Sequence, residues 1–136
     1  MLQPEYNLYD RASFEGSLSD LCKAEGLGVI TYYSLAAGFL SGKYRSIADL
    51  GKSPRGGGVK KYLDGRGQRI LGALDAVSAR HKAKPAEVAL AWIIARPDVT
   101  APIASATSLE QLESMIRSAS LTLSTADIRE LDDASA

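Results

Sequence analysis

Two residue types that build many protein sites are almost missing from this chain. It has one cysteine, Cys22, and one histidine, His81. A single cysteine excludes an internal disulfide and a cysteine-rich metal site. The histidine lies in the stretch ARHKAKP, among cations typical of a helix end, where a surface role is more common than catalysis or metal binding. We therefore expect no metal site, and a reducing compartment such as the cytoplasm.

An excess of charge of one sign is also missing. The sequence has 16 basic and 16 acidic residues, for a net charge of +0. A nucleic-acid-binding domain usually carries a strongly basic stripe, and no block of like charge stands out along this sequence. We expect no nucleic-acid partner.

Long hydrophobic runs are absent as well. No window approaches the roughly 18 apolar residues of a membrane-spanning helix, and the start, MLQPEYNLYD, has neither the basic nor the apolar region of a secretory signal. We expect a protein that is neither exported nor embedded in a membrane. Its 136 residues correspond to a single domain, residues 1–136.

The patterns that are present alternate between strands and helices. Short apolar or aromatic runs predict strands at residues 3–9, 28–34 and 99–105. Apolar spacing of three and four predicts helices at residues 14–26, 68–81, 85–96, 109–119 and 125–132. Ser13 and Gly26 are expected to bound the first helix, Pro85 begins the third, and Ser108 with Gln111 forms a capping box.

This order predicts an α/β fold built from βαβ units with a parallel sheet. The run GVITYYS is continuously apolar, which favours a strand buried on both faces. Three strands are few for such a sheet, because a closed barrel of this type has eight strands and about 250 residues. The sequence therefore predicts part of a (β/α)8 barrel, with about three parallel strands and covering helices.

Two loops follow the predicted strands at their carboxyl ends, where α/β folds place their sites. The stretch AAGFLSGKYR offers small residues and cations to a phosphate, and ASATSLEQ offers hydroxyls and the free amides of a helix start. Each loop alone also fits an ordinary surface connection or helix cap. Together they indicate an anion-binding cleft shared by adjacent strand ends.

The stretches LQPEYNLYDR, EGLGVITYYSLAAGFLSGKYR, PAEVALAWIIARPDVTAPIASATSLEQLE and LTLSTADIRELD resemble the C-terminal half of an aldo-keto reductase, from the sixth barrel strand onward. The resemblance covers nearly the whole chain. It implies a TIM-barrel fold and a carbonyl reductase that uses NADP(H), or less often NAD(H). The expected ligands are therefore a nicotinamide nucleotide and a small carbonyl substrate.

The same resemblance implies the roles of particular residues. Tyr32 matches the aromatic residue that stacks on the nicotinamide ring, and Gln3 matches the glutamine that binds its carboxamide. Further cofactor-binding positions implied by the family are Tyr33, Ser34, Leu35, Gly38, Lys43, Arg55, Ser105, Thr107 and Gln111. Arg45 is a weaker candidate. The turn ASATS lacks the cation that usually pairs with a 2′-phosphate, which leaves the choice between NADP and NAD open.

The resemblance assigns no catalytic residue. The family's proton-donating tyrosine and its lysine, aspartate and histidine partners belong to the first half of the barrel, outside residues 1–136, and no tyrosine here has a lysine four positions later. Three interpretations stay open: a reductase completed by another chain, a non-catalytic nucleotide-binding or self-assembling half-barrel, and a truncated gene product. Exposed strand edges predict a homodimer in each case.

Overall fold

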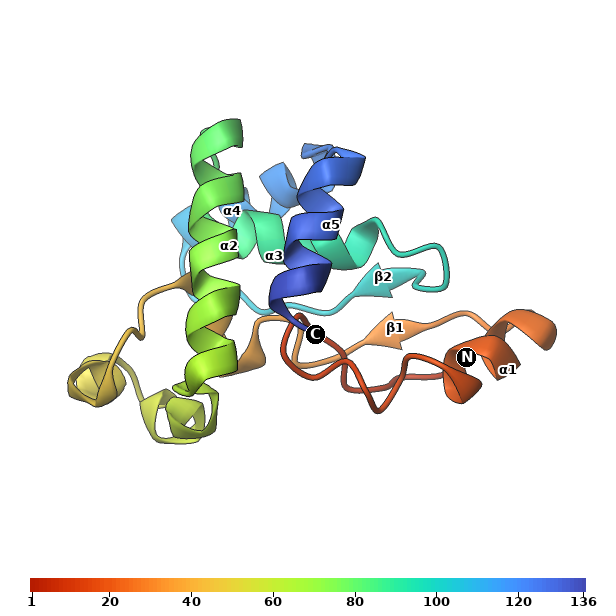
Figure 1. Ribbon diagram of the computed structural model, residues 1–136, viewed down its shortest axis with the longest axis horizontal. Coiled ribbons are helices and arrows are strands. Elements are labelled where there is room, and N and C mark those ends of the chain that lie inside the picture. The colour runs from red at the N-terminus through yellow and green to blue at the C-terminus, as the bar shows by residue number, and fades with distance from the viewer.

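The computed structural model describes residues 1–136 and contains a small parallel sheet (Figure 1). Strand β1 (Ile30–Thr31) pairs in parallel with β2 (Ala101–Pro102). Both strands point in the same direction, so the segments that follow them leave at one edge of the sheet. The parallel arrangement confirms the α/β fold class, and the two named strands lie inside the second and third predicted ones.

The first predicted strand is present only as two isolated parallel bridges to the β1 segment, Leu2 to Val29 and Glu5 to Tyr32. Between them Pro4 accepts a hydrogen bond from the Tyr32 amide (3.0 Å) but has no N–H to donate in return. The missing donor interrupts the ladder. The second half of the predicted strand forms bends instead, so the prediction was too long.

The sheet is covered on one face only, which corrects the expectation that 28–34 is buried on both. Val29 and Thr31 are fully buried, whereas the alternate residues of the same segment are not. Because side chains alternate along a strand, bridge register places six residues on the other side, here called the open face: Gln3, Glu5, Ile30, Tyr32, Ala101 and Ile103. The continuous apolar run was misleading because the open face has no covering layer in this chain.

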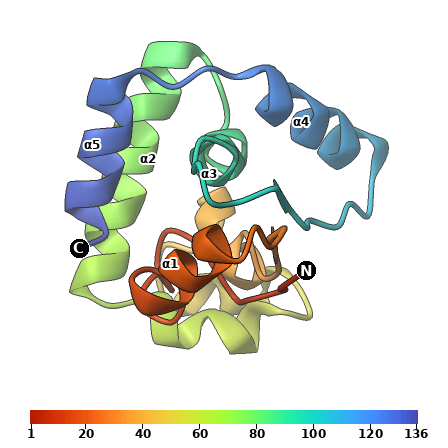
Figure 2. The same cartoon turned by 90° about the vertical axis from the view of Figure 1, so that its right-hand side faces the viewer.

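The chain has five α-helices (Figure 2). They are α1 (Ser17–Ala24), α2 (Gly65–His81), α3 (Pro85–Ile94), α4 (Leu109–Ser120) and α5 (Thr125–Ala134). None of them is long and apolar enough to cross a bilayer. All five were predicted, with differences at their ends.

The N-terminal ends of the helices show why the observed bounds differ from the predicted ones. Gly16, not Ser13, is the N-cap of α1, because Ser13 lies in the turn before the helix and its hydroxyl donates to the Glu5 carbonyl (3.4 Å). Helix α2 begins three residues early because the Asp64 carboxylate accepts a hydrogen bond from the Gly67 amide (2.7 Å). The Ser108 hydroxyl caps α4 as predicted by accepting from the Gln111 amide (3.2 Å), but the Gln111 side chain accepts from the Thr107 amide and not from that of Ser108, so the predicted capping box is wrong.

The glycine-rich stretch between β1 and α2 is folded into three 3-10 helices, η1 (Ala36–Ser41), η2 (Ile47–Lys52) and η3 (Gly56–Tyr62). Residues 36–45 of this stretch, AAGFLSGKYR, were expected to form a loop. Gly56 shows why glycine is needed here, since an added Cβ would lie 1.6 Å from the Leu50 carbonyl oxygen. Close packing between η2 and η3 therefore depends on a missing side chain.

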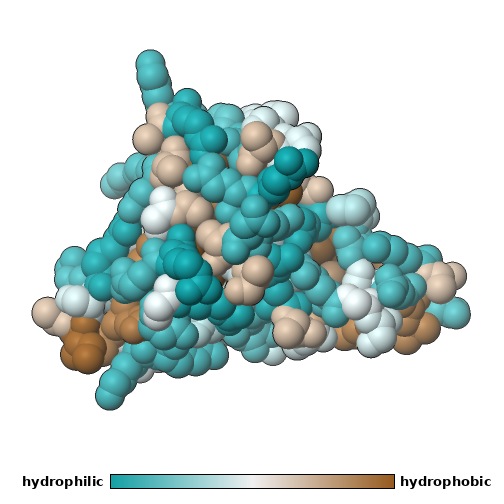
Figure 3. Space-filling view, in the orientation of Figure 1, coloured by the Kyte–Doolittle hydropathy of each residue, from teal (hydrophilic) through white to brown (hydrophobic).

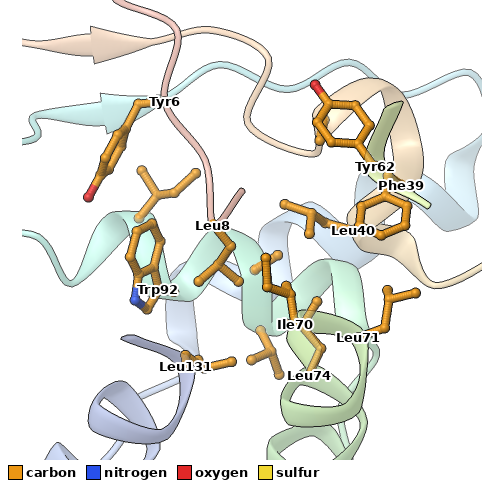
Figure 4. Close-up of a cluster of buried hydrophobic side chains, with 14 of the residues drawn as sticks. Tyr6, Leu8, Phe39, Leu40, Tyr62, Ile70, Leu71, Leu74, Trp92 and Leu131 are labelled. Carbon is orange, nitrogen blue, oxygen red and sulfur yellow. The ribbon is translucent and has the colours of Figure 1, made fainter. Parts of the chain in front are cut away.

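The core lies between the sheet and the helices and includes the fully buried Trp92 of α3 (Figure 4). Trp92 stacks on Tyr6 (5.4 Å between centroids), and its indole N–H donates to Asp132 of α5 (2.9 Å). The single cysteine, Cys22, is also buried in this core. The side shown in Figure 3 is mostly hydrophilic, with hydrophobic groups at the two ends of the long axis.

Candidate functional site

The open face brings two of the predicted cofactor-binding residues together. Gln3 lies opposite Ile30, and Tyr32 lies next along β1 on the same face, opposite Glu5. Tyr32 is 39% exposed, so its ring is accessible at the carboxyl end of the strand. An accessible aromatic ring beside a carboxamide side chain is an arrangement that can hold a flat heteroaromatic ligand.

The turn after Tyr32 presents free backbone donors. The amides of Tyr33, Ser34 and Leu35 make no hydrogen bond within the chain, whereas the Ser34 hydroxyl is buried and donates to the Thr31 carbonyl (3.3 Å). Consecutive unpaired N–H groups are the donors from which anion-binding turns are built. The buried hydroxyl fixes the turn that presents them.

Backbone strain marks the same turn. Tyr33, Ala36 and Ala37 have φ values of 60°, 50° and 56°, and Gly38 has 92°. Non-glycine residues avoid this left-handed region, and a cluster of them is typical of functional turns. The carboxamide of the buried Asn7 helps to hold the turn by donating to the Tyr33 carbonyl (3.0 Å).

One cation is held over this turn. An added Cβ on Gly38 would lie 3.7 Å from the Lys43 Nζ, which also sits 5.1 Å from the centre of the Tyr44 ring and makes no ion pair. Lys43 is therefore available to a phosphate, and glycine at position 38 lets it approach the backbone.

Arg45 and Arg55 differ in availability. The Arg45 guanidinium is bound in bidentate fashion by Asp75 of α2 (2.8 Å for both bonds), and this pairing raises its pKa. Arg45 is thus a structural residue that ties the loop to α2. Arg55 is exposed at the start of η3 and makes no ion pair.

The turn after β2 carries the remaining predicted residues on its surface. Thr107 and Gln111 are brought into contact, since the Gln111 side-chain oxygen accepts from both the amide (2.7 Å) and the hydroxyl (3.0 Å) of Thr107. Ser105, which precedes Thr107 by two residues, is exposed. Lys84 reaches the first turn of α4, but Glu110 pairs with it (2.9 Å).

The tyrosines with shifted acidity are poor proton donors. Burial, and then a hydrogen bond to Glu15, raises the pKa of Tyr6, while a hydrogen bond to Asp64 raises that of Tyr9. Burial and the neighbouring Asp10 carboxylate raise the pKa of Tyr62. A carbonyl-reducing site needs a donor whose pKa is lowered toward neutrality, and these environments do the opposite.

A second polar cluster near the site was missed by the sequence analysis. Tyr9 and Tyr62 pack edge to face (4.8 Å between centroids), with Arg66 4.0 Å from the centre of the Tyr9 ring and Lys61 4.7 Å from that of Tyr62. The signal available in the sequence was local charge: residues 43–69 hold eight Lys and Arg against two Asp.

Comparison with known proteins identifies the family of this chain. The sequence pattern of the aldo/keto reductase family matches residues 1–136. The chain belongs to the aldo/keto reductase family. A probable aldo-keto reductase 1 of Glycine max is 29% identical over 138 residues, covering 98% of this chain and 39% of the relative. Protein tas of Escherichia coli K12 is 31% identical over 137 residues, covering 96% and 38%.

Two further comparisons agree with this assignment. An L-glyceraldehyde 3-phosphate reductase of Escherichia coli O157:H7 is 30% identical over 137 residues, covering 96% of this chain and 40% of the relative. A crystal structure of a thermostable aldo-keto reductase with the inhibitor epalrestat matches with a TM-score of 0.70 at 21% identity, covering 97% of this chain and 38% of that one. The chain thus has the fold of part of an aldo-keto reductase barrel, and it spans about two-fifths of the length of these relatives.

Proposed function

We propose that this chain is the nicotinamide-nucleotide-binding part of an aldo-keto reductase. The observation that carries the proposal is the strained turn after β1, where three unpaired amides follow the exposed ring of Tyr32. Family membership adds oxidoreductase chemistry with a nicotinamide cofactor. NADP(H) is the proposed cofactor, with NAD(H) as the alternative.

The chain's own residues would divide the work of binding. Tyr32 would stack on the nicotinamide ring while Gln3, on the same face, hydrogen-bonds its carboxamide. The amides of Ser34 and Leu35 and the free charge of Lys43 would bind the pyrophosphate, with Arg55 adding a further positive charge. When bound, the cofactor supplies the hydride for carbonyl reduction.

The adenosine end would lie at the turn after β2. There the exposed hydroxyls of Ser105 and Thr107 and the Gln111 side chain are the available groups. Hydroxyls and backbone amides bind a 2′-phosphate less strongly than an arginine does, so we propose that discrimination between NADP(H) and NAD(H) is weak.

Turnover would need a proton donor from outside residues 1–136. The environments of Tyr6, Tyr9 and Tyr62 raise their pKa values, which makes them unsuitable. We propose that another part of a complete barrel, in the same polypeptide or in a partner, supplies the donor and the rest of the carbonyl site.

Calorimetric titration with NADPH and with NADH tests the binding proposal. Tyr32→Ala should weaken cofactor affinity about tenfold through lost stacking, while Tyr32→Phe, which keeps the ring, should bind like the parent. Binding that is unchanged in Tyr32→Ala, or absent in the parent chain, would refute the proposal. A panel of aldehydes added to the NADPH complex should give no oxidation from this chain alone.

The second candidate function, a self-assembling half-barrel, is favoured by the sheet edges. The amides of Gln3 and Glu5 point away from β1 and make no hydrogen bond, and the apolar side chains of Ala101 and Ile103 are exposed on the open face. We propose that two copies associate through this face as a homodimer when no other barrel part covers it.

A further inference from the structure

Unpaired positive charge is concentrated in one segment of this otherwise balanced chain. Residues 43–69 have a net charge of +6, so the rest of the chain carries −6. Arg45 and Lys52 are paired with carboxylates. The cations of the segment that make no ion pair are Lys43, Arg55, Lys60, Lys61, Arg66 and Arg69. Lys43 and Arg55 belong to the proposed cofactor site, which leaves four without an assigned role.

Two of these four cations are held in place by aromatic rings. The Arg66 guanidinium lies 4.0 Å from the centre of the Tyr9 ring and also donates to the Tyr9 carbonyl (2.9 Å). The Lys61 ammonium lies 4.7 Å from the centre of the Tyr62 ring. Stacking of this kind positions a cation without neutralising it. Lys60 and Arg69 are exposed and make no such contact.

The supporting rings are themselves fixed. Tyr62 is fully buried and stacks on Phe39 (5.4 Å between centroids), as Figure 4 shows, and its hydroxyl donates to Asp10 (3.0 Å). The Tyr9 hydroxyl donates to Asp64 (2.5 Å), which also caps α2. The two nearby carboxylates are therefore hydrogen-bonded to tyrosines, and neither forms an ion pair with the cations.

The cluster is joined to the cofactor turn by a short chain of contacts. Asn7 donates one hydrogen bond to the Asp10 carboxylate (3.2 Å) and another to the carbonyl of Tyr33 (3.0 Å). Tyr33 follows the residue proposed to stack on the nicotinamide. A ligand group bound by the cluster would thus lie beside the reacting end of the cofactor and not at its adenosine end.

We propose that Lys61 and Arg66 form a subsite for a phosphate monoester carried by the carbonyl substrate. A phosphate monoester has a charge of about −1.5 to −2 at neutral pH and three acceptor oxygens. The two fixed cations, neither of them in an ion pair, would supply charge-assisted contacts to these oxygens. The description of the ligand as a substrate rests on the proposed function, whereas phosphate binding can be measured without it.

Titration with inorganic phosphate, followed by nuclear magnetic resonance of the whole chain, tests the subsite. We expect shifts at Tyr9, Lys61 and Arg66, and Lys61→Ala or Arg66→Ala should each weaken phosphate affinity about tenfold by removing a charge-assisted contact. Lys60→Ala and Arg69→Ala are matched controls with the same loss of charge and should change the affinity less than about twofold. Lys61→Arg should keep the affinity, which separates lost binding from lost folding.

A second arm separates the substrate from the cofactor as the source of the phosphate. With NADPH at a saturating concentration, the binding of glyceraldehyde 3-phosphate should depend on Lys61. The binding of glyceraldehyde, which has no phosphate, should not depend on Lys61. Equal losses in the two control variants, or phosphate shifts confined to Lys43 and Arg55 and abolished by NADPH, would overturn the subsite. Phosphate binding that is intact in a chain unable to bind NADPH would refute the proposed function alone.

Discussion

At the residue scale, missing side chains decide several features. Gly56 and Gly67 lie so close to carbonyl oxygens that no Cβ can be placed there, and Gly38 lets the Lys43 side chain lie over the turn after β1. Glycine is usually associated with flexible loops, yet here it allows close packing of the segment between β1 and α2.

Substitution of Gly67 tests this view. An alanine Cβ would lie 1.8 Å from the Tyr62 carbonyl oxygen, so Gly67→Ala should reduce the free energy of unfolding by about 2–4 kcal/mol. Urea denaturation followed by circular dichroism measures the change. Gly72→Ala, in the same helix with nothing within 4 Å, should be neutral or stabilise by up to about 1 kcal/mol. Equal effects at both positions would contradict the packing argument.

At the element scale, α5 is held to the core by a half-buried polar network. Asp132 of α5 accepts hydrogen bonds from the Trp92 indole (2.9 Å) and the Arg96 guanidinium (3.4 Å). Arg96 also contacts the Tyr6 hydroxyl and Glu15 (3.0 Å for both), which links the last helix to the first strand segment. The C-terminal helix is therefore part of the core and not an appendage.

Removal of Asp132 should loosen this attachment. Asp132→Ala leaves the Trp92 N–H without a partner and removes one of the two carboxylates beside Arg96, which keeps Glu15, and we expect a loss of about 1–3 kcal/mol in the free energy of unfolding. Asp133→Ala, the adjacent exposed carboxylate with no hydrogen bond or ion pair, should stay within about 0.5 kcal/mol of the parent. In the Asp132→Ala variant, the amides of α5 should exchange their hydrogens before those of the other helices.

Acid should weaken the contacts between elements. Burial tends to raise the pKa values of Glu15, Glu87 and Asp127, but hydrogen bonds and nearby cations outweigh burial and lower all three. A carboxyl group with a lowered pKa in the folded state adds stability above its unfolded pKa, and that stability is lost as the pH falls through the folded value.

Thermal melting from neutral to acid pH measures this effect. The melting temperature should fall as the pH drops below the ordinary glutamate pKa of 4.5. Asp127 joins α5 to α2 through His81 (2.6 Å) and Arg80 (3.3 Å), so Asp127→Asn should be less stable at neutral pH and show a shallower acid decline. A decline of the same slope in the variant would exclude Asp127 as a contributor.

At the scale of the whole molecule, the sheet is unfinished. One face is covered by helices, and the outer edges end in the unpaired amides of Gln3 and Glu5 on one side and in Pro102, which has no N–H, on the other. This chain covers 38–40% of the length of its relatives, and their further residues can complete such a barrel. The proposed cofactor binding is therefore linked to completion of the barrel, because Tyr32 and Gln3 lie on the uncovered face.

Light scattering tests the proposed dimer. The chain should elute as a homodimer, and Ile103→Lys should produce a monomer by placing a charge on the open face. Leu21→Lys, a change at an exposed apolar residue of α1 outside that face, should leave the dimer intact. A parent chain that stays monomeric at the highest soluble concentration would contradict association through the open face.

Sequence periodicity alone determined the helices and the parallel strand order, because these follow from local apolar spacing and from the end signals of each helix. Sequence similarity added the family and the candidate cofactor residues. Spatial neighbours decided the rest. Residues distant in the chain decide whether a strand is covered on one face or two. They also decide that Arg45 pairs with Asp75 and that Lys61 and Arg66 lie on the rings of two tyrosines. Local patterns carry no record of such partners, so only the folded structure could reveal them.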